Sequence, residues 1–199
     1  ELRLDLHIHS ERSFDGCMSL SEIVALARER GLNGVAICDH DRVLDEVPEF
    51  DDFLVIPATE VSTERGHLLG LFVREPIETR TFSESVTAIH AQGGLAVIAH
   101  PFEHSTDANR LDDVMSRLDG VEIWNSRADR KNKSANAMAR ELAQKWKKPV
   151  TAGSDAHVPE EVGGGVTVLE ADELSLSAVK AALLRGAKQV EAAVAAQCA

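Results

Sequence analysis

Short apolar runs along this chain repeatedly end in histidine or acidic residues, and this recurrence constrains the fold more than any other feature of the sequence. The carboxyl ends of parallel strands meet at one rim of a barrel, so we expect these side chains to converge there. The five clusters are residues 4–9, residues 38–40, Glu60 with His67 close behind it, residues 99–101 and residues 154–157.

Two of these clusters have a spacing that suits metal binding. His7 and His9 are two residues apart, as are Asp155 and His157. Side chains two residues apart on an extended strand point to the same side, so each pair can converge on one ion. Neutral imidazole together with carboxylate suits Zn, Mn or Fe better than Ca or Mg alone. The pattern therefore predicts a catalytic metal site.

The size and charge of the chain narrow the class of protein. It has 199 residues, of which 44% are hydrophobic, so we expect residues 1–199 to form a single domain around one substantial core. The formal net charge of −12 disfavours long nucleic acid and anionic membranes as partners. Bound divalent cations would offset part of that charge locally, so a small phosphorylated substrate can still enter the site.

The cysteines and the absence of long apolar runs favour a cytoplasmic protein. Cys17, Cys38 and Cys198 are odd in number and have no C-x-x-C spacing, which argues against a disulfide framework or a structural zinc site. No apolar run approaches the roughly 18–20 residues of a membrane span, and no basic-then-apolar leader begins the sequence. The oligomeric state stays open, with a homo-oligomer among the alternatives.

Strand-like apolar runs alternate with stretches of helical periodicity. The predicted strands are residues 2–8, 34–38, 54–57, 67–73, 95–99, 121–124, 150–152 and 166–170. The predicted helices are residues 19–30, 83–92, 111–118, 133–146 and 177–184. The repeated order of strand and helix predicts a mostly parallel sheet with helices outside it, closed into a small barrel. Residues 186–199 fit a strand, a short helix or a tail equally well.

The clusters, taken in order, resemble the PHP (polymerase and histidinol phosphatase) superfamily, and in particular its small stand-alone phosphoesterases. The motifs that carry the resemblance are Asp5-Leu6-His7-Ile8-His9-Ser10, Ser13-Phe14-Asp15-Gly16, Asp39-His40, Glu60, Ala99-His100-Pro101, Val121-Glu122-Ile123-Trp124-Asn125 and Gly153-Ser154-Asp155-Ala156-His157. Together they cover nearly the whole chain, and their combination is far more specific than any one of them.

The resemblance implies an α/β fold, a distorted seven-stranded TIM-like (β/α) barrel, and a site for two or three divalent ions. These would be Mn, Fe or Zn, with Mg as an alternative. By this resemblance His7, His9, Glu60 and Asp155 hold one ion, Glu60, His67 and His100 hold a second, and Asp15, His40 and His157 hold a third. Glu60 would bridge the first two ions.

The resemblance also implies how the reaction would proceed. Metal coordination lowers the pKa of bound water to roughly 7, so the resulting hydroxide can attack phosphorus without a separate strong base. We therefore expect Glu60, Asp155 and His157 to be the catalytic residues, while Asp5 and Asp39 orient the imidazoles. The candidates for binding the phosphate or the leaving group are Asn125, Arg127 and Arg42.

These features predict a metal-dependent hydrolase of small phosphate monoesters, such as a nucleotide or a sugar phosphate. The alternative is a phosphodiesterase or 5′ exonuclease on short oligonucleotides, although 4% aromatic residues with no Tyr disfavour a nucleic-acid groove. An amidohydrolase is less favoured, because Glu60 stands where such enzymes would carry a bridging lysine. A regulatory metal-binding module without activity is the remaining alternative. About twenty residues separate His100 from Trp124, so the site is expected to be open or completed by a neighbouring subunit.

Overall fold

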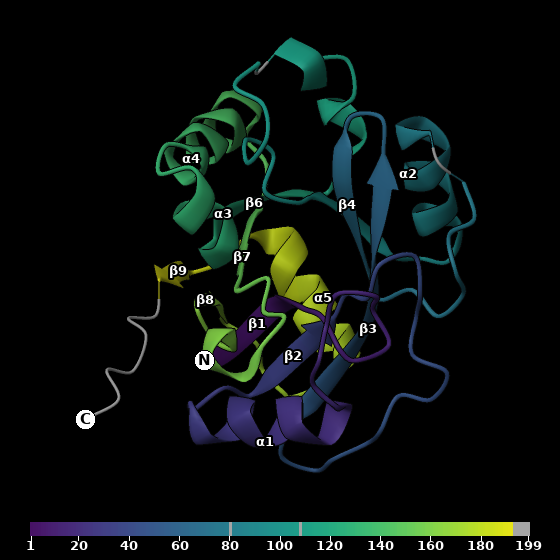
Figure 1. The fold of residues 1–199 in the computed structure, drawn as a ribbon, viewed down its shortest axis with the longest axis vertical. Coiled ribbons are helices and arrows are strands. Elements are labelled where there is room, and N and C mark those ends of the chain that lie inside the picture. The colour runs from purple at the N-terminus through teal and green to yellow at the C-terminus, as the bar shows by residue number, and fades with distance from the viewer. Residues whose placement is uncertain (80, 108, 193–199) are drawn as a thin grey trace.

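The computed structural model describes residues 1–79, 81–107 and 109–192, and within them nine strands form one sheet (Figure 1). The strands lie in the order β7-β6-β5-β4-β3-β2-β1-β8-β9. Their bounds are β1 Leu2–Ile8, β2 Gly34–Ile37, β3 Leu54–Thr63, β4 Gly66–Leu71, β5 Leu95–Ile98, β6 Gly120–Asn125, β7 Val150–Gly153, β8 Gly165–Leu169 and β9 Gln189–Ala192. Each predicted apolar run falls on one of the strands β1 to β8. β9 lies in the stretch that the sequence left open, and residues 193–199 are outside the described residues.

The sheet curls until its first and seventh strands almost meet. β7 stands at one edge of the strand order, yet Ala156, just beyond it, forms a parallel bridge with Ile8. Asp155 also donates its backbone N–H to the His7 carbonyl at 2.8 Å. Strands β1 to β7 therefore form a nearly closed barrel, and β8 and β9 extend the sheet beyond β1. The predicted barrel class is confirmed, with nine strands in place of the expected seven.

The prediction of a mostly parallel sheet is wrong, because half of the strand pairs are antiparallel. β1–β2, β2–β3, β5–β6 and β6–β7 are parallel, whereas β3–β4, β4–β5, β1–β8 and β8–β9 are antiparallel. β3 runs on past Pro57 to Thr63, and β4 begins at Gly66. The short turn between Thr63 and Gly66 cannot hold a crossover helix, so β4 has to run back alongside β3.

The helices are α1 Leu20–Glu29, α2 Phe82–Ala91, α3 Ser126–Lys131, α4 Ala135–Trp146 and α5 Leu176–Arg185. α1 is capped by Ser19, whose hydroxyl accepts the Glu22 N–H at 3.3 Å. The helix predicted over residues 111–118 is wrong: two separate 3-10 turns, Asn109–Leu111 and Met115–Arg117, take its place. α3 was not predicted, because six residues are too few to show a helical period.

β1 contributes apolar side chains to two hydrophobic clusters. Leu4 and Leu6 are fully buried and pack with Val179 and Leu183 of α5, which lies at the centre of the view beside β1 and β2 (Figure 1). Ile8 instead packs with Ile23 and Val24 of α1, in a second cluster. The ladder between β1 and β2 shifts register between Asp5 and Ile8, so strict alternation along β1 is interrupted at the residues that lead into the histidines. Among the described residues, no helix is long and apolar enough to span a lipid bilayer.

Candidate metal centre

The end of β1 and the residue after it place two buried imidazoles side by side. His7 and His9 are fully buried, and their Nε2 atoms lie 3.2 Å apart. Two imidazole nitrogens this close repel each other through their lone pairs unless a proton or a cation lies between them. Gly153 of β7 makes this arrangement feasible, because a Cβ there would come within 2.3 Å of the His7 Cβ.

Two carboxylates face these imidazoles. Glu60 Oε2 lies 3.4 Å from His7 Nε2 and 3.2 Å from His9 Nε2. Asp155 Oδ1 lies 3.6 Å from His7 Nε2 and 3.2 Å from His9 Nε2. The donor atoms of these four residues lie within 4.8 Å of one another. They come from the end of β1 and the residue after it, from β3, and from the segment after β7.

The other oxygen of Glu60 faces a second group. Glu60 Oε1 lies 2.8 Å from His67 Nδ1 and 2.9 Å from His100 Nε2. His67 stands at the start of β4, so the expectation that each cluster follows a strand end does not hold for it. The antiparallel course of β4 nevertheless brings that start to the same rim as Glu60, since Ser62 pairs with His67 in the ladder.

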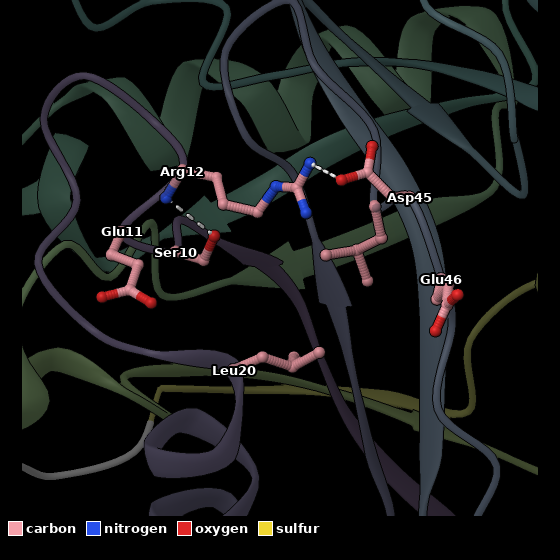
Figure 2. Close-up of a pocket in the computed structure, with 7 residues that line it drawn as sticks. Ser10, Glu11, Arg12, Leu20, Asp45 and Glu46 are labelled. Carbon is pink, nitrogen blue, oxygen red and sulfur yellow. Dashed lines mark hydrogen bonds and ion pairs between the residues drawn. The ribbon is translucent and has the colours of Figure 1, made fainter.

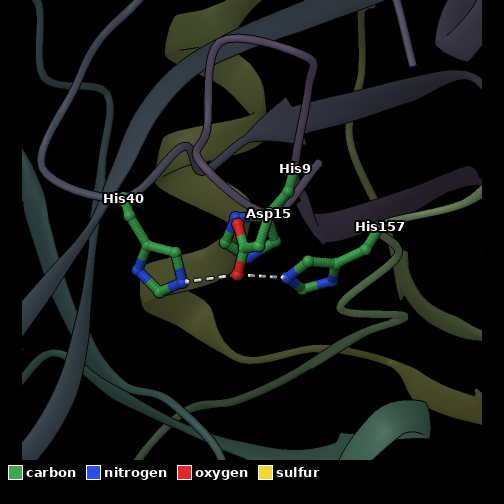
Figure 3. Close-up of side chains that lie close together, drawn as sticks. All are labelled: His9, Asp15, His40 and His157. Atoms are coloured by element: carbon green, nitrogen blue, oxygen red, sulfur yellow. Dashed lines mark hydrogen bonds and ion pairs between the residues drawn. The ribbon is translucent and has the colours of Figure 1, made fainter. Parts of the chain in front are cut away.

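A third group lies toward the surface (Figure 3). Asp15 Oδ2 is 3.0 Å from His157 Nε2 and 3.4 Å from His40 Nε2, and it lies between the two imidazoles. His9 joins this group as well, because its ring stacks on His157 with centroids 4.2 Å apart. The Asp15 side chain is 28% exposed and that of His67 in the second group is 31% exposed, so both of these groups reach the solvent.

Two glutamates that the sequence analysis did not assign to the site also belong to it. Glu122 Oε1 lies 3.0 Å from His7 Nδ1, and Glu103 Oε2 lies 3.1 Å from His100 Nδ1. A carboxylate behind an imidazole fixes the ring and its tautomer. Glu122 lies in the motif of residues 121–125, but its position in the sequence gives no sign of a contact with His7. Glu103 follows His100 by three residues, which is the only signal that could have found it.

Asp5 and Asp39 do not contact the imidazoles, which corrects the expectation for them. Asp39 accepts the Ser10 N–H at 2.6 Å and its hydroxyl at 2.7 Å. Asp5 accepts backbone N–H groups of Ser154 at 2.9 Å and Gly163 at 2.8 Å. Both aspartates therefore secure the loops that carry the histidines.

The three candidates for binding substrate have different surroundings. Asn125 is fully buried, and its amide donates to Glu122 and Asp155 while its oxygen caps α3 through the Ala128 N–H. Because every polar atom of Asn125 is engaged, its position argues against a substrate contact and for a role in orienting carboxylates. Arg127 lies 3.6 Å from Glu161, and Arg42 is exposed next to His40.

Two surface hollows lie next to these groups, beside the loops after β1 and β2. One, of about 520 Å³, is lined by Ser10, Arg12 and Asp45 among others, with Arg12 and Asp45 paired at 2.6 Å (Figure 2). The other, of about 490 Å³, is lined by Arg12, Arg42 and Arg74 together with acidic residues. Neither includes a metal-ligand candidate, but Ser10 directly follows His9.

The pKa values of the buried carboxylates and imidazoles depend on how closely these groups are paired. Burial opposes ionisation of Glu60, but the His7, His100 and His67 imidazoles outweigh burial and hold the pKa of Glu60 well below its usual range. Burial likewise disfavours protonated His9 and His100, yet Glu60 and Asp155 raise the pKa of each to about 9. Without a cation, protons would have to balance these carboxylates.

Two residues of the candidate centre have a strained backbone. His100 has φ 25° and Asp155 has φ 56°, a region that non-glycine residues rarely adopt. Such conformations persist only when the surroundings hold them, and they cluster at functional sites. Imidazole and carboxylate donors converging from several strands fit divalent cations by chemistry and by spacing, so three groups could each hold one ion.

Comparison with known families agrees with this geometry. The PHP domain family model matches residues 5–62, and the PHP-associated family model matches residues 133–187. An uncharacterised protein of Methanocaldococcus jannaschii is 33% identical over 166 residues, which are 72% of this chain and 95% of that protein. The chain belongs to the PHP family.

Solved structures share the fold. A two-domain protein from Bacteroides vulgatus that contains a predicted PHP-like metal-dependent phosphoesterase matches with a TM-score of 0.68 at 20% identity, over 92% of this chain and 62% of that one. A lesion-specific endonuclease from Pyrococcus furiosus matches with a TM-score of 0.69 at 18% identity, over 95% of this chain and 58% of that one. This chain thus spans less than two thirds of either neighbour.

Proposed function

We propose that this chain is a metal-dependent phosphoesterase that hydrolyses small phosphate monoesters, with two or three divalent cations bound by the three donor groups. The observation that carries the proposal is the position of Glu60. Its Oε2 faces His7 and His9, whereas its Oε1 faces His67 and His100. One carboxylate that serves two donor groups is the arrangement of a two-ion site for phosphoryl chemistry.

The cations, when bound, would lower the pKa of coordinated water and neutralise charge on the phosphate. The chain's own residues hold that site in shape. Glu122 and Glu103 fix the rings of His7 and His100, and Asn125 orients Asp155 by donating to its Oδ2 at 3.3 Å. The buried position of Glu60 shields its oxygens from competing water.

The substrate we propose is a small phosphorylated molecule that enters at the third donor group. Asp15 there is partly open to solvent, and the exposed Arg42 lies two residues after His40, so we propose that its guanidinium binds a phosphate oxygen or the leaving group. Mn, Fe and Zn suit this mixture of imidazole and carboxylate, and Mg suits it less well. The net charge of −12 disfavours long nucleic acid.

A phosphodiesterase is the second candidate, because the Pyrococcus furiosus neighbour with the same fold is an endonuclease. An open third donor group would also admit a diester. The two candidates differ in what they release: a monoesterase frees inorganic phosphate, whereas a diesterase leaves the phosphate on one product.

The test strips the protein with a chelator, reloads it with Mn, Fe, Zn or Mg, and measures phosphate release from a panel of monoesters. Bis(4-nitrophenyl) phosphate and short oligonucleotides measure diester cleavage in parallel. Glu60→Gln should abolish most turnover and remove at least one bound ion, whereas Glu141→Gln, at an exposed position on α4, should change neither. Turnover of lactones or amides without phosphate release, or full activity of Glu60→Gln, would overturn the proposal.

A further inference from the structure

Phe14 is the most exposed large apolar side chain among the described residues, at 86%. A lone exposed apolar residue is ordinary on a protein surface. This one is distinguished by its neighbour, because its ring stacks on the imidazole of His40 with centroids 5.0 Å apart and an interplanar angle of 25°. His40 belongs to the partly exposed donor group of Asp15 and His157, so the exposed ring lies at the edge of the candidate centre.

The loop that carries Phe14 is held in position from both sides. The Ser13 hydroxyl donates to Asp15 Oδ1 at 2.8 Å and accepts the His40 backbone N–H at 3.2 Å. Gly16 approaches the backbone of Ser10 so closely that a Cβ would lie 2.1 Å from the Ser10 carbonyl oxygen. Phe14 is therefore presented by a constrained turn, which lowers the entropic cost of binding against it.

From this placement we infer that Phe14 is a specificity-determining residue, a platform on which a planar aromatic part of the substrate stacks. The inference rests on the proposed function, because it takes the phosphate to bind at the donor group of Asp15, His40 and His157. The organic group of a monoester bound there extends away from the donor atoms toward the rim. A flat ring in that direction meets the exposed ring of Phe14.

The chemistry of the surface favours a ring over a sugar or a short alkyl group. Aromatic rings gain from offset stacking beyond the area that they bury, and a base stacked on an aromatic side chain is sequence-tolerant because every base has a flat face. A glycerol or ethyl group is too small to cover the Phe14 ring. A simple aryl group and a nucleobase share the required planar ring, and the experiment separates them.

The experiment compares benzylphosphonate with ethylphosphonate, two stable analogues that differ in the ring, by calorimetric titration into manganese-loaded protein. Phe14→Ala should weaken the binding of benzylphosphonate by about tenfold or more, which corresponds to about 1.4 kcal/mol. The same substitution should weaken the binding of ethylphosphonate by less than about twofold. Phe14→Leu keeps an apolar cover on His40 and should lose part of the preference. Phe50→Ala, at another exposed phenylalanine that packs on Phe53, should keep the wild-type ratio.

Adenosine monophosphate and ribose 5-phosphate form the second pair of probes. A preference for the adenosine compound that disappears in Phe14→Ala assigns the platform to a nucleobase, whereas a preference for benzylphosphonate alone assigns it to a smaller aryl group. Equal losses for both members of each pair, loss of bound manganese in Phe14→Ala, or no binding of benzylphosphonate to the wild type at millimolar concentration would overturn the platform.

Failure of this inference can be told apart from failure of the proposed function. If manganese-loaded wild type releases phosphate but Phe14→Ala keeps the wild-type binding ratio, the platform is wrong and the phosphoesterase stands. If no ester is hydrolysed but the ratio changes as expected, the platform stands and the proposed reaction is wrong.

Discussion

Glu122 contacts three separate parts of the candidate centre. Its Oε1 lies 3.0 Å from His7 Nδ1, and its Oε2 accepts the His100 backbone N–H at 2.8 Å and the Asn125 amide at 3.0 Å. One fully buried carboxylate therefore connects β1, the segment after β5 and the end of β6. A histidine ligand gains both its orientation and its basicity from such a partner.

Glu122→Gln should weaken metal binding by about 10–100-fold, since glutamine offers one acceptor oxygen where the two carboxylate oxygens now serve three donors. The loss should show in titration of the metal-free protein with Mn or Zn, with Glu141→Gln as the matched surface control. Metal affinity equal to that of the wild type would mean that His7 needs no carboxylate behind it.

At the scale of elements, the centre depends on how closely β7 approaches β1. Gly153 ends β7, and a Cβ at this position would lie 2.3 Å from the His7 Cβ and 2.9 Å from Glu122 Oε1. No flexible side-chain end is involved on the His7 side, so the two strands would have to separate. Separation would also move Asp155, whose N–H donates to the His7 carbonyl.

Gly153→Ala should therefore lower the free energy of unfolding by about 1–3 kcal/mol and weaken metal binding together, because the overpacked contact displaces a candidate ligand. Ser175→Ala is the comparison: it removes the cap of α5, where the hydroxyl accepts the Ala178 N–H at 3.2 Å, and should cost about 1 kcal/mol with no effect on the metal. Urea denaturation and metal titration of both variants test the pair. If Gly153→Ala bound metal as tightly as the wild type, the close approach of β7 to β1 would not be needed to place the ligands.

The positions of elements were easier to predict than their directions. Runs of apolar residues are local, so each of β1 to β8 overlaps a predicted strand. The reversal at Thr63 depends on a turn only two residues long that sequence reasoning did not recognise, because β3 continues beyond Pro57 through residues with no strict alternation. Over residues 111–118 the predicted helical period did not become a helix, and the chain forms only two 3-10 turns there.

For the whole molecule, protonation and metal binding compete for the same atoms. Burial acts against the charged imidazoles of His9 and His100, but neighbouring carboxylates raise the pKa of each to about 9, so both carry protons at pH 7 in the metal-free protein. Metal binding should therefore release protons, and the apparent affinity should rise with pH up to about 9. Calorimetry at pH 7 in buffers of different ionisation enthalpy counts the protons. A binding heat that does not vary with the buffer would contradict this account.

The same shifts make the stability of the metal-free protein depend on pH. The folded-state pKa of about 9 lies above the ordinary value of 6.5, so the stabilising contribution of His9 and His100 is fully present below pH 6.5 and is lost as pH rises through 9. The midpoint of urea unfolding of the metal-free protein should fall between pH 7 and pH 9.5, and reloading with metal should remove most of that fall. A midpoint that rises over this range would show that the imidazoles are neutral in the folded protein.

The sequence by itself determined which strand ends carry candidate metal donors, and that the neighbouring His7 and His9 can face the same way, because side chains two residues apart on extended chain point to one side. Only the tertiary structure decided which donors share an ion-sized space and which carboxylates support them. His67 reaches Glu60 through an antiparallel hairpin, and Glu122 reaches His7 across 115 residues of chain. Such contacts depend on how the barrel nearly closes, and no spacing within the sequence records that approach.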